Sequence, residues 1–92
     1  MNANSFTHEL MQNYPNPFNP TTNINFSLKE ESYVTLKVYD VLGREVDILV
    51  NGNLPAGVHS VEFNGESFES GLYFYEINTG TFRDTKKFIL IK

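Results

Sequence analysis

The sequence contains no cysteine, and its longest unbroken apolar runs are only a few residues long. Without cysteine the chain can form neither a disulfide framework nor a thiolate metal site, and it offers no thiol nucleophile. Runs this short predict no membrane insertion, because a spanning helix needs about 20 apolar residues. Basic residues are scarce as well, seven against eleven acidic ones. The net charge of −4 therefore argues against nucleic acid as a partner, since its phosphate backbone attracts basic surfaces.

The first twelve residues lack the basic stretch and apolar run of a secretory signal peptide. A chain of 92 residues predicts one small domain, and such a domain buries only about 60–65% of the surface of its unfolded chain. Five tyrosines and eight phenylalanines must therefore supply much of its core.

Three prolines fall within six residues, at Pro15, Pro17 and Pro20. Proline fixes φ and has no N–H group, and it pushes the preceding residue towards an extended backbone. Residues 13–20, which we name the strap, therefore cannot form a helix or a central strand. We expect Tyr14 and Phe18 to lie on an apolar surface, with Pro15 and Pro17 outside any strand pairing. Composition alone also allows a plain proline-rich linker.

Apolar and polar residues alternate along most of the remaining chain, which is the period of a β-strand. The residues expected on buried strand faces are Ile24, Phe26, Leu28, Val34, Leu36, Val38, Val46, Ile48, Val50, His59, Val61, Phe63, Tyr73, Tyr75 and Ile77. Turn signals recur about every ten residues, which predicts an all-β, antiparallel β-sandwich of six to seven short strands. The pattern leaves the strand order open.

Short irregular segments separate these strands. Asp40 to Gly43 predicts a tight turn, because Asp bonds nearby backbone N–H groups and Gly accepts a positive φ. Residues 51–57 read as an irregular loop, and residues 78–80 as a hairpin turn. A short early strand around residues 9–12 would be the seventh.

No group of residues predicts an active site. His59 is in phase with Val61 and Phe63, which favours a packed, hydrogen-bonded histidine over a metal ligand. The acidic pairs fall in predicted turns, and Asp40 with Arg44 reads as a capped turn rather than a catalytic pair. We therefore predict no enzyme activity, no catalytic or metal-binding residues and no cofactor.

The end of the chain has four consecutive apolar residues between lysines: Lys86, Lys87, Phe88, Ile89, Leu90, Ile91 and Lys92. A strand with one wet face would not be apolar at four consecutive positions. One interpretation is a strand buried on both faces, with a loop such as the strap covering it. The other is an edge or face kept exposed for a partner, which strand edges can recruit by β-strand addition. A homodimer through this terminal edge strand follows from the second interpretation.

Five blocks of the sequence, in this order, resemble the C-terminal sorting domains of the type IX secretion system. They are Tyr14–Thr22, Val38–Val46, Leu54–His59, Ser70–Tyr75 and Lys86–Lys92, and the resemblance covers roughly residues 13 to 92. The motif residues singled out are Tyr14, Pro15, Asn16, Pro17, Phe18, Asn19, Pro20, Asp40, Gly43, Arg44, Gly57 and Gly71. The resemblance implies an immunoglobulin-like sandwich, in agreement with the strand pattern.

The resemblance also implies a function. Such a domain follows a cargo protein, is recognised in the periplasm and is escorted through an outer-membrane translocon to the cell surface or medium. A sortase-like peptidase then removes it, and the cargo is attached to lipopolysaccharide. We expect residues 1–12 to be a linker remnant that contains the cleavage point, and Lys86–Lys92 to be the recognised element.

Two alternatives share the predicted fold. A carbohydrate-binding or adhesive module would use Tyr33, Tyr39, Tyr73 and Tyr75 as a stacking platform, although the alternation places Tyr73 and Tyr75 with Ile77. A passive spacer domain would be followed by further structured sequence.

Overall fold

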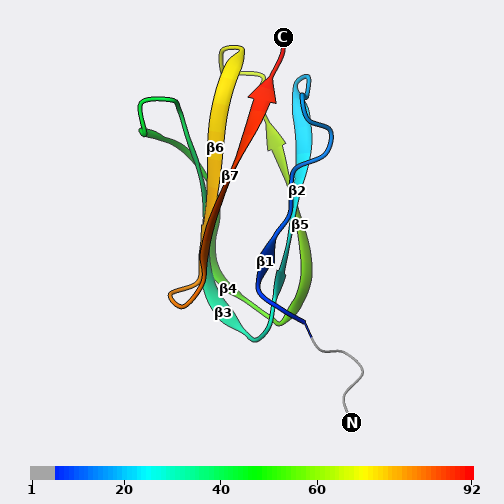
Figure 1. The fold of residues 1–92 in the computed structure, drawn as a ribbon, viewed down its shortest axis with the longest axis vertical. Coiled ribbons are helices and arrows are strands. Elements are labelled where there is room, and N and C mark those ends of the chain that lie inside the picture. Colours follow the sequence, from blue (N-terminus) through cyan, green and yellow to red (C-terminus); the bar gives the residue numbers. More distant parts are fainter. Residues whose placement is uncertain (1–5) are drawn as a thin grey trace.

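The computed structural model describes residues 6–92, which form two antiparallel sheets packed face to face (Figure 1). The strands are β1 (Glu9–Leu10), β2 (Thr21–Leu28), β3 (Ser32–Tyr39), β4 (Glu45–Leu54), β5 (Gly57–Asn64), β6 (Gly71–Asn78) and β7 (Arg83–Leu90). Within these residues no helix is long and apolar enough to cross a membrane. The predicted all-β sandwich is confirmed, including the short first strand.

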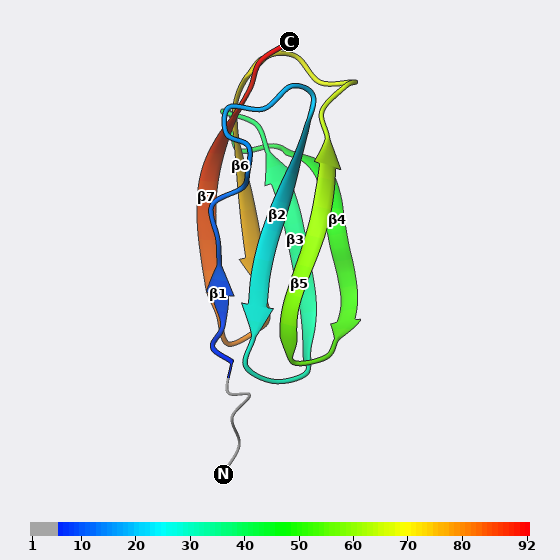
Figure 2. The ribbon, with the colours of Figure 1, turned by 90° about the vertical axis from the view of Figure 1, so that its right-hand side faces the viewer.

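The strand order is β1-β2-β5 in one sheet and β4-β3-β6-β7 in the other. Strands β2 and β5 thus oppose β3, β6 and β7, which is the arrangement at the centre of immunoglobulin-like sandwiches. Strand β4 pairs with β3 and forms the far edge of the larger sheet. Figure 2 shows this edge and the β7 edge on opposite sides of the molecule.

The core lies between the sheets and follows the predicted alternation in β2, β3 and β6. Its members are Leu10, Phe18, Ile24, Phe26, Leu28, Val34, Leu36, Val38, Phe63, Tyr73, Tyr75, Ile77, Phe88 and Leu90. Aromatic rings fill its centre, where Phe88 contacts Phe63 at a centroid distance of 5.4 Å and Tyr75 at 5.0 Å. A small sandwich therefore depends on a few large side chains for its stability.

Strand β4 departs from the prediction in two ways. It runs to Leu54, so most of the predicted loop over residues 51–57 is strand, and only Pro55 and Ala56 lie between β4 and β5. The β3–β4 pairing is irregular opposite Lys37 and Tyr39, and a bulge of this kind shifts the phase of the side chains. Leu49 instead of Ile48 packs on the core, and Ile48 is 47% exposed.

The turns follow their predicted chemistry. Asp40 Oδ1 accepts hydrogen bonds from the N–H groups of Leu42 and Arg44, and Gly43 has a φ of +80°. The hairpin between β6 and β7 is closed by a bond from the Thr79 N–H to the Phe82 carbonyl. These local turns fix how neighbouring strands meet, and they bring the end of the chain back alongside β6.

Candidate functional site

The terminal residues alternate, although their sequence is continuously apolar. Phe88 and Leu90 point into the core, with at most 1% of their surface exposed, whereas Ile89 and Ile91 point outward and are 43% and 50% exposed. The strand is therefore not buried on both faces. The apolar run arises because Ile89 on the outer face of β7, and Ile91 just after the strand, stand where solvated polar residues would be expected.

The strap closes the edge of β7 (Figure 2). Phe18 donates its N–H to the Ile89 carbonyl at 3.0 Å, and its own carbonyl accepts from the Ile91 N–H at 2.9 Å. The Ile89 N–H is bonded to Asn16 Oδ1, and Gln12 Nε2 donates to the Lys87 carbonyl. The open terminal edge predicted from the sequence is thus wrong for residues 87–91, because the strap occupies the bonds that a further strand would need.

Phe18 confirms the prediction of a packed ring, and Tyr14 contradicts it. Phe18 is 2% exposed and lies against Phe63 and Phe88, whereas Tyr14 is 79% exposed. The Tyr14 backbone explains the difference, since its N–H and carbonyl pair with Asn23 of β2. This pairing directs the Tyr14 ring outward. Pro15 and Pro17 lie outside the strands, as predicted.

A buried polar cluster, which the sequence analysis did not predict, anchors the base of the strap. The buried Asn13 side chain donates to Thr22 Oγ1 and to the Pro15 carbonyl, both at 3.0 Å. The Asn13 N–H donates to the hydroxyl of Tyr75 at 2.8 Å, and that hydroxyl donates to the Met11 carbonyl at 2.7 Å. Each group is satisfied, so the cluster fixes the strap on the sandwich at little cost in free energy.

The Tyr75 hydroxyl makes stability sensitive to alkaline pH. Burial raises the pKa of Tyr75 to about 12, against a bond from the Asn13 N–H that lowers it. Because the pKa of Tyr75 is raised on folding, the stability that comes from the buried neutral hydroxyl is fully present below the unfolded pKa of 10. This stability is lost as the pH rises through the folded pKa. We expect the free energy of unfolding to fall between about pH 10 and pH 12, by roughly 2–3 kcal/mol from this group.

Chemical denaturation between pH 8 and pH 11 checks this expectation, with Tyr75→Phe as the comparison. The variant should be less stable at pH 8, because two buried groups lose their partner, and its stability should fall less steeply with pH. Equal slopes for the two proteins would contradict the role given to Tyr75.

The lysines of the terminal segment differ in their contacts. Lys92 holds the loop between β5 and β6, since its Nζ donates to the carbonyls of Glu66 and Phe68 and its N–H donates to Ser70. Lys86 lies 3.9 Å from Asp84. Lys87 is exposed, and within residues 6–92 it forms no ion pair. Lys87 is therefore the terminal cation with most freedom to meet a partner.

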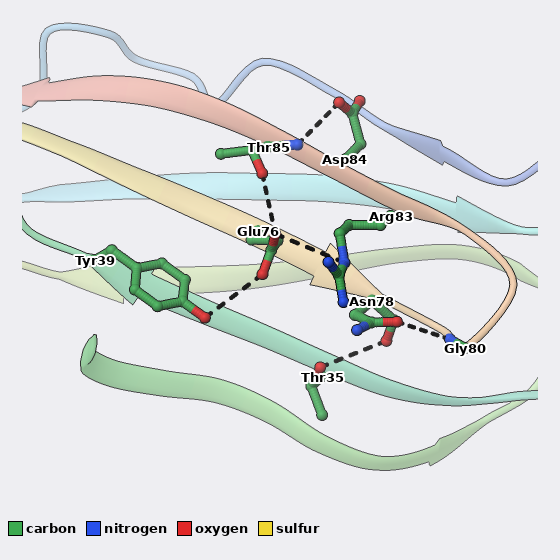
Figure 3. A network of polar contacts seen from close by, with 8 residues as sticks. All are labelled: Thr35, Tyr39, Glu76, Asn78, Gly80, Arg83, Asp84 and Thr85. Carbon is green, nitrogen blue, oxygen red and sulfur yellow. Dashed lines mark hydrogen bonds and ion pairs between the residues drawn. The ribbon is translucent and has the colours of Figure 1, made fainter. Parts of the chain in front are cut away.

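The outer face of the larger sheet has a polar and an apolar part. Figure 3 shows the polar part, where Glu76 accepts from Tyr39 and Thr85 and lies 3.8 Å from Arg83. Towards the carboxyl end of β7 the apolar residues Leu72 and Ile89 face each other across the two strands. We name Leu72, Lys87, Ile89 and Ile91 the terminal surface; it is a candidate site for a protein partner.

The remaining candidates have structural roles. His59 stacks on Phe26 and lies 2.8 Å from the Pro55 carbonyl through Nε2, which confirms a packed, hydrogen-bonded histidine. Asp40 caps its turn and contacts the exposed Arg44 at 2.8 Å, and these bonds hold the pKa of Asp40 below its ordinary value. Among residues 6–92, no three His, Asp or Glu side chains gather as a metal site would require.

The other motif residues also act on the fold. Gly43, Gly57 and Gly71 have positive φ values of 80°, 125° and 153°. Asn19 is exposed, and the Pro20 carbonyl accepts from the Gly65 N–H at the end of the sandwich. Tyr73 and Tyr75 are core residues, so the platform of four tyrosines is not formed.

Comparisons with known proteins agree with this architecture. No curated protein matches the chain. A similar solved structure is that of PorZ, described as an essential bacterial surface component of the type-IX secretion system of human oral-microbiomic Porphyromonas gingivalis. The TM-score is 0.60 at 20% sequence identity; the match covers 88% of this chain but 11% of that protein, and it shows the fold alone.

A family model for the secretion system C-terminal sorting domain matches residues 12–92, from Gln12, just before the strap, to Lys92. The match includes six of the seven strands and all the motif residues singled out from the sequence. The chain therefore belongs to the family of secretion system C-terminal sorting domains, the sorting domains of the type IX system that its sequence resembles.

Proposed function

We propose that this domain is the C-terminal address of a longer cargo protein, which the type IX machinery carries from the periplasm through an outer-membrane translocon. A sortase-like peptidase then removes the domain, and the cargo stays at the cell surface or enters the medium. The observation that carries the proposal is the family match over residues 12–92, which covers nearly the whole folded unit. The domain is in this view a substrate of the machinery, and its own residues perform no catalysis.

The position of β1 limits where the peptidase can cut. Leu10 is buried and pairs with Phe26 of β2, and the Thr7 carbonyl accepts a bond from Ser27. These contacts support assigning residues 7–12 to the folded unit instead of a free linker. Residues 1–5 lie outside the described part of the chain. A cut that leaves the domain intact falls before Thr7.

We propose that the machinery reads the terminal surface through its side chains. Strand addition at residues 87–91 would require the strap to leave, and the strap is held by the buried ring of Phe18. The exposed side chains of Ile89 and Ile91 need no such rearrangement. Lys87 adds a positive charge that forms no ion pair within residues 6–92. A complementary partner surface is apolar with an acidic rim.

Ile89→Thr is expected to reduce export of a cargo reporter at least severalfold, because it removes an apolar contact from the terminal surface. Threonine keeps the β-branched shape that suits a strand, so the domain should stay folded. The matched control is Val58→Thr on β5, where the valine is 63% exposed and far from the terminal surface in the other sheet.

Secreted and retained reporter are measured by immunoblot, and folding by thermal melting of the purified domains. Reduced export of Ile89→Thr with normal export of Val58→Thr supports recognition through this surface. Equal export of both variants would show that recognition uses other residues, and would leave the sorting role of the domain itself unaffected.

A further inference from the structure

The second edge of the larger sheet is open. Strand β4 has ten residues, and within residues 6–92 it pairs on one side only, with β3. From Ile48 to Leu54 it carries no charged side chain, and charges are the usual means by which edge strands avoid pairing. Figure 2 shows β4 at the side of the molecule opposite β7, away from the strap. Strand β4 therefore has the properties of an edge that accepts another strand.

The pairing register shows which groups of β4 point outward. Backbone N–H and C=O groups of an antiparallel strand point alternately to its two sides. The strap bonds to Ile89, so Phe88 must bond to β6. The same alternation can be followed strand by strand through the pairing registers, from β7 to β6, then to β3 and finally to β4. It leaves Asn51 and Asn53 as the residues of β4 whose backbone N–H and C=O groups point away from β3. Ile48, which faces Lys37, donates its N–H to Asp47 Oδ1, in agreement with this alternation.

The order of residue types along this edge is the same when read from either end, namely apolar, Asn, Gly, Asn, apolar: Val50-Asn51-Gly52-Asn53-Leu54. An antiparallel pair about a two-fold axis at Gly52 places Asn51 opposite Asn53 of the partner subunit and Val50 opposite Leu54 of the partner subunit. A two-fold interface needs such a self-complementary surface. Each amide side chain then meets an amide, each apolar side chain meets an apolar one, and no like charges face each other.

Gly52 suits the centre of this arrangement. The two glycines would form the non-hydrogen-bonded pair, where the strands approach to about 4.5 Å between Cα atoms. Apart from its two neighbours in the chain, no residue among 6–92 has an atom within 4 Å of a Cβ placed on Gly52, so the space above this glycine is open. The backbone groups of Asn51 and Asn53 would supply the bonds on either side of the axis.

We propose that two copies of this domain associate through their β4 edges, which joins their larger sheets into one continuous sheet. Five residues from each chain pair, so the interface is small and the dimer forms in a concentration-dependent, reversible way. The terminal surface lies at the opposite edge of the same sheet and stays accessible in the dimer. This association is separate from sorting and holds whether or not the proposed function does.

Sedimentation velocity over a concentration series, with amide chemical shifts by NMR, tests the proposal on the 92-residue chain. We expect a monomer–dimer equilibrium, and concentration-dependent shifts at Asn51, Gly52 and Asn53. The double variant Asn51→Lys/Asn53→Lys places lysines opposite each other at both sides of the axis, so its dissociation constant should rise about tenfold. The variant Asn51→Lys/Asn53→Glu places Lys opposite Glu and should restore dimerisation.

Both asparagines are exposed, so neither variant should alter folding, and both lose the same bond from the Tyr33 hydroxyl to Asn51. The two variants therefore form a matched pair that differs at position 53 alone, which carries a positive charge in one variant and a negative charge in the other. A chain that stays monomeric up to millimolar concentration, equal dimerisation of the two variants, or shifts confined to β7 would each overturn the proposal.

Discussion

Replacing Phe18 with alanine is expected to lower the free energy of unfolding by about 3–5 kcal/mol, which is the usual cost of removing a buried phenylalanine ring. The ring is 2% exposed and stacks on Phe88 at 5.0 Å, with Phe63 at 5.9 Å. Its removal leaves a cavity between the sheets at the place where the strap crosses. For a domain of this size the melting temperature should fall by on the order of 15–25 °C.

Tyr14→Ala is the matched control for this substitution. Tyr14 lies in the same strap and is 79% exposed, so its loss should change stability by no more than about 0.5 kcal/mol. Thermal melting of both variants separates the two roles. Similar melting temperatures for the two variants would show that the Phe18 ring does not fix the strap on the core.

The loss of Phe18 should also release the end of the chain. The Phe18 carbonyl accepts from the Ile91 N–H, and Asn16 Oδ1 in the same strap accepts from the Ile89 N–H. An unanchored strap should therefore expose both amides to solvent exchange. Amide hydrogen exchange of Ile89 and Ile91 should then accelerate more than that of residues in the centre of β3. Uniform acceleration throughout the domain would indicate global destabilisation without a specific effect on the terminal strand.

The parts of the fold that could be predicted from the sequence are those set by local alternation. In β2, β3 and β6 the inward-pointing side chains recur at every second position and, apart from Thr22, the buried ones among them are apolar, so the faces of these strands follow directly. The turn at Asp40 could be predicted for the same reason, because Asp and Gly act within a few residues.

The existence of β4 and the packing of Val46 and Val50 on the core could be predicted. The phase between them could not, because it depends on pairing with β3. The irregularities opposite Lys37 and Tyr39 come from the register between two strands, and no pattern within β4 marks them. The sequence suggested Ile48 as a core residue on spacing alone. The structure uses Leu49, which changes which face of the strand is apolar.

The contacts that attach the strap to the sandwich also could not be predicted from local sequence patterns. Asn13 and Tyr75 are separated by 62 positions in the sequence. The hydrogen bond between them depends on the tertiary structure, which brings Tyr75 of β6 to the base of the strap. Tyr14 and Phe18 both looked like anchors, since proline spacing says nothing about which ring faces the core. The pairing of Tyr14 with Asn23 decides that question. The apolar run at the end of the sequence was enough to locate the terminal surface. That the strap would pair with the edge of β7 could not be predicted.

A reporter directed to the periplasm and fused at its C-terminus to this 92-residue chain should reach the cell surface or the medium of a bacterium with a type IX system. The family match and the folded unit over residues 6–92 predict that the domain acts on a foreign cargo. The difference in exported amount between the fused and the unfused reporter should be large, because an unfused reporter has no route across the outer membrane.

The most direct measurement compares the location of this fusion in two otherwise identical hosts, one with a functional type IX translocon and one without. The predicted result is reporter outside the cell in the first host and reporter confined to the periplasm in the second, with the unfused reporter periplasmic in both. Periplasmic retention of a folded fusion in the competent host, or release from both hosts alike, would contradict a sorting role for this domain.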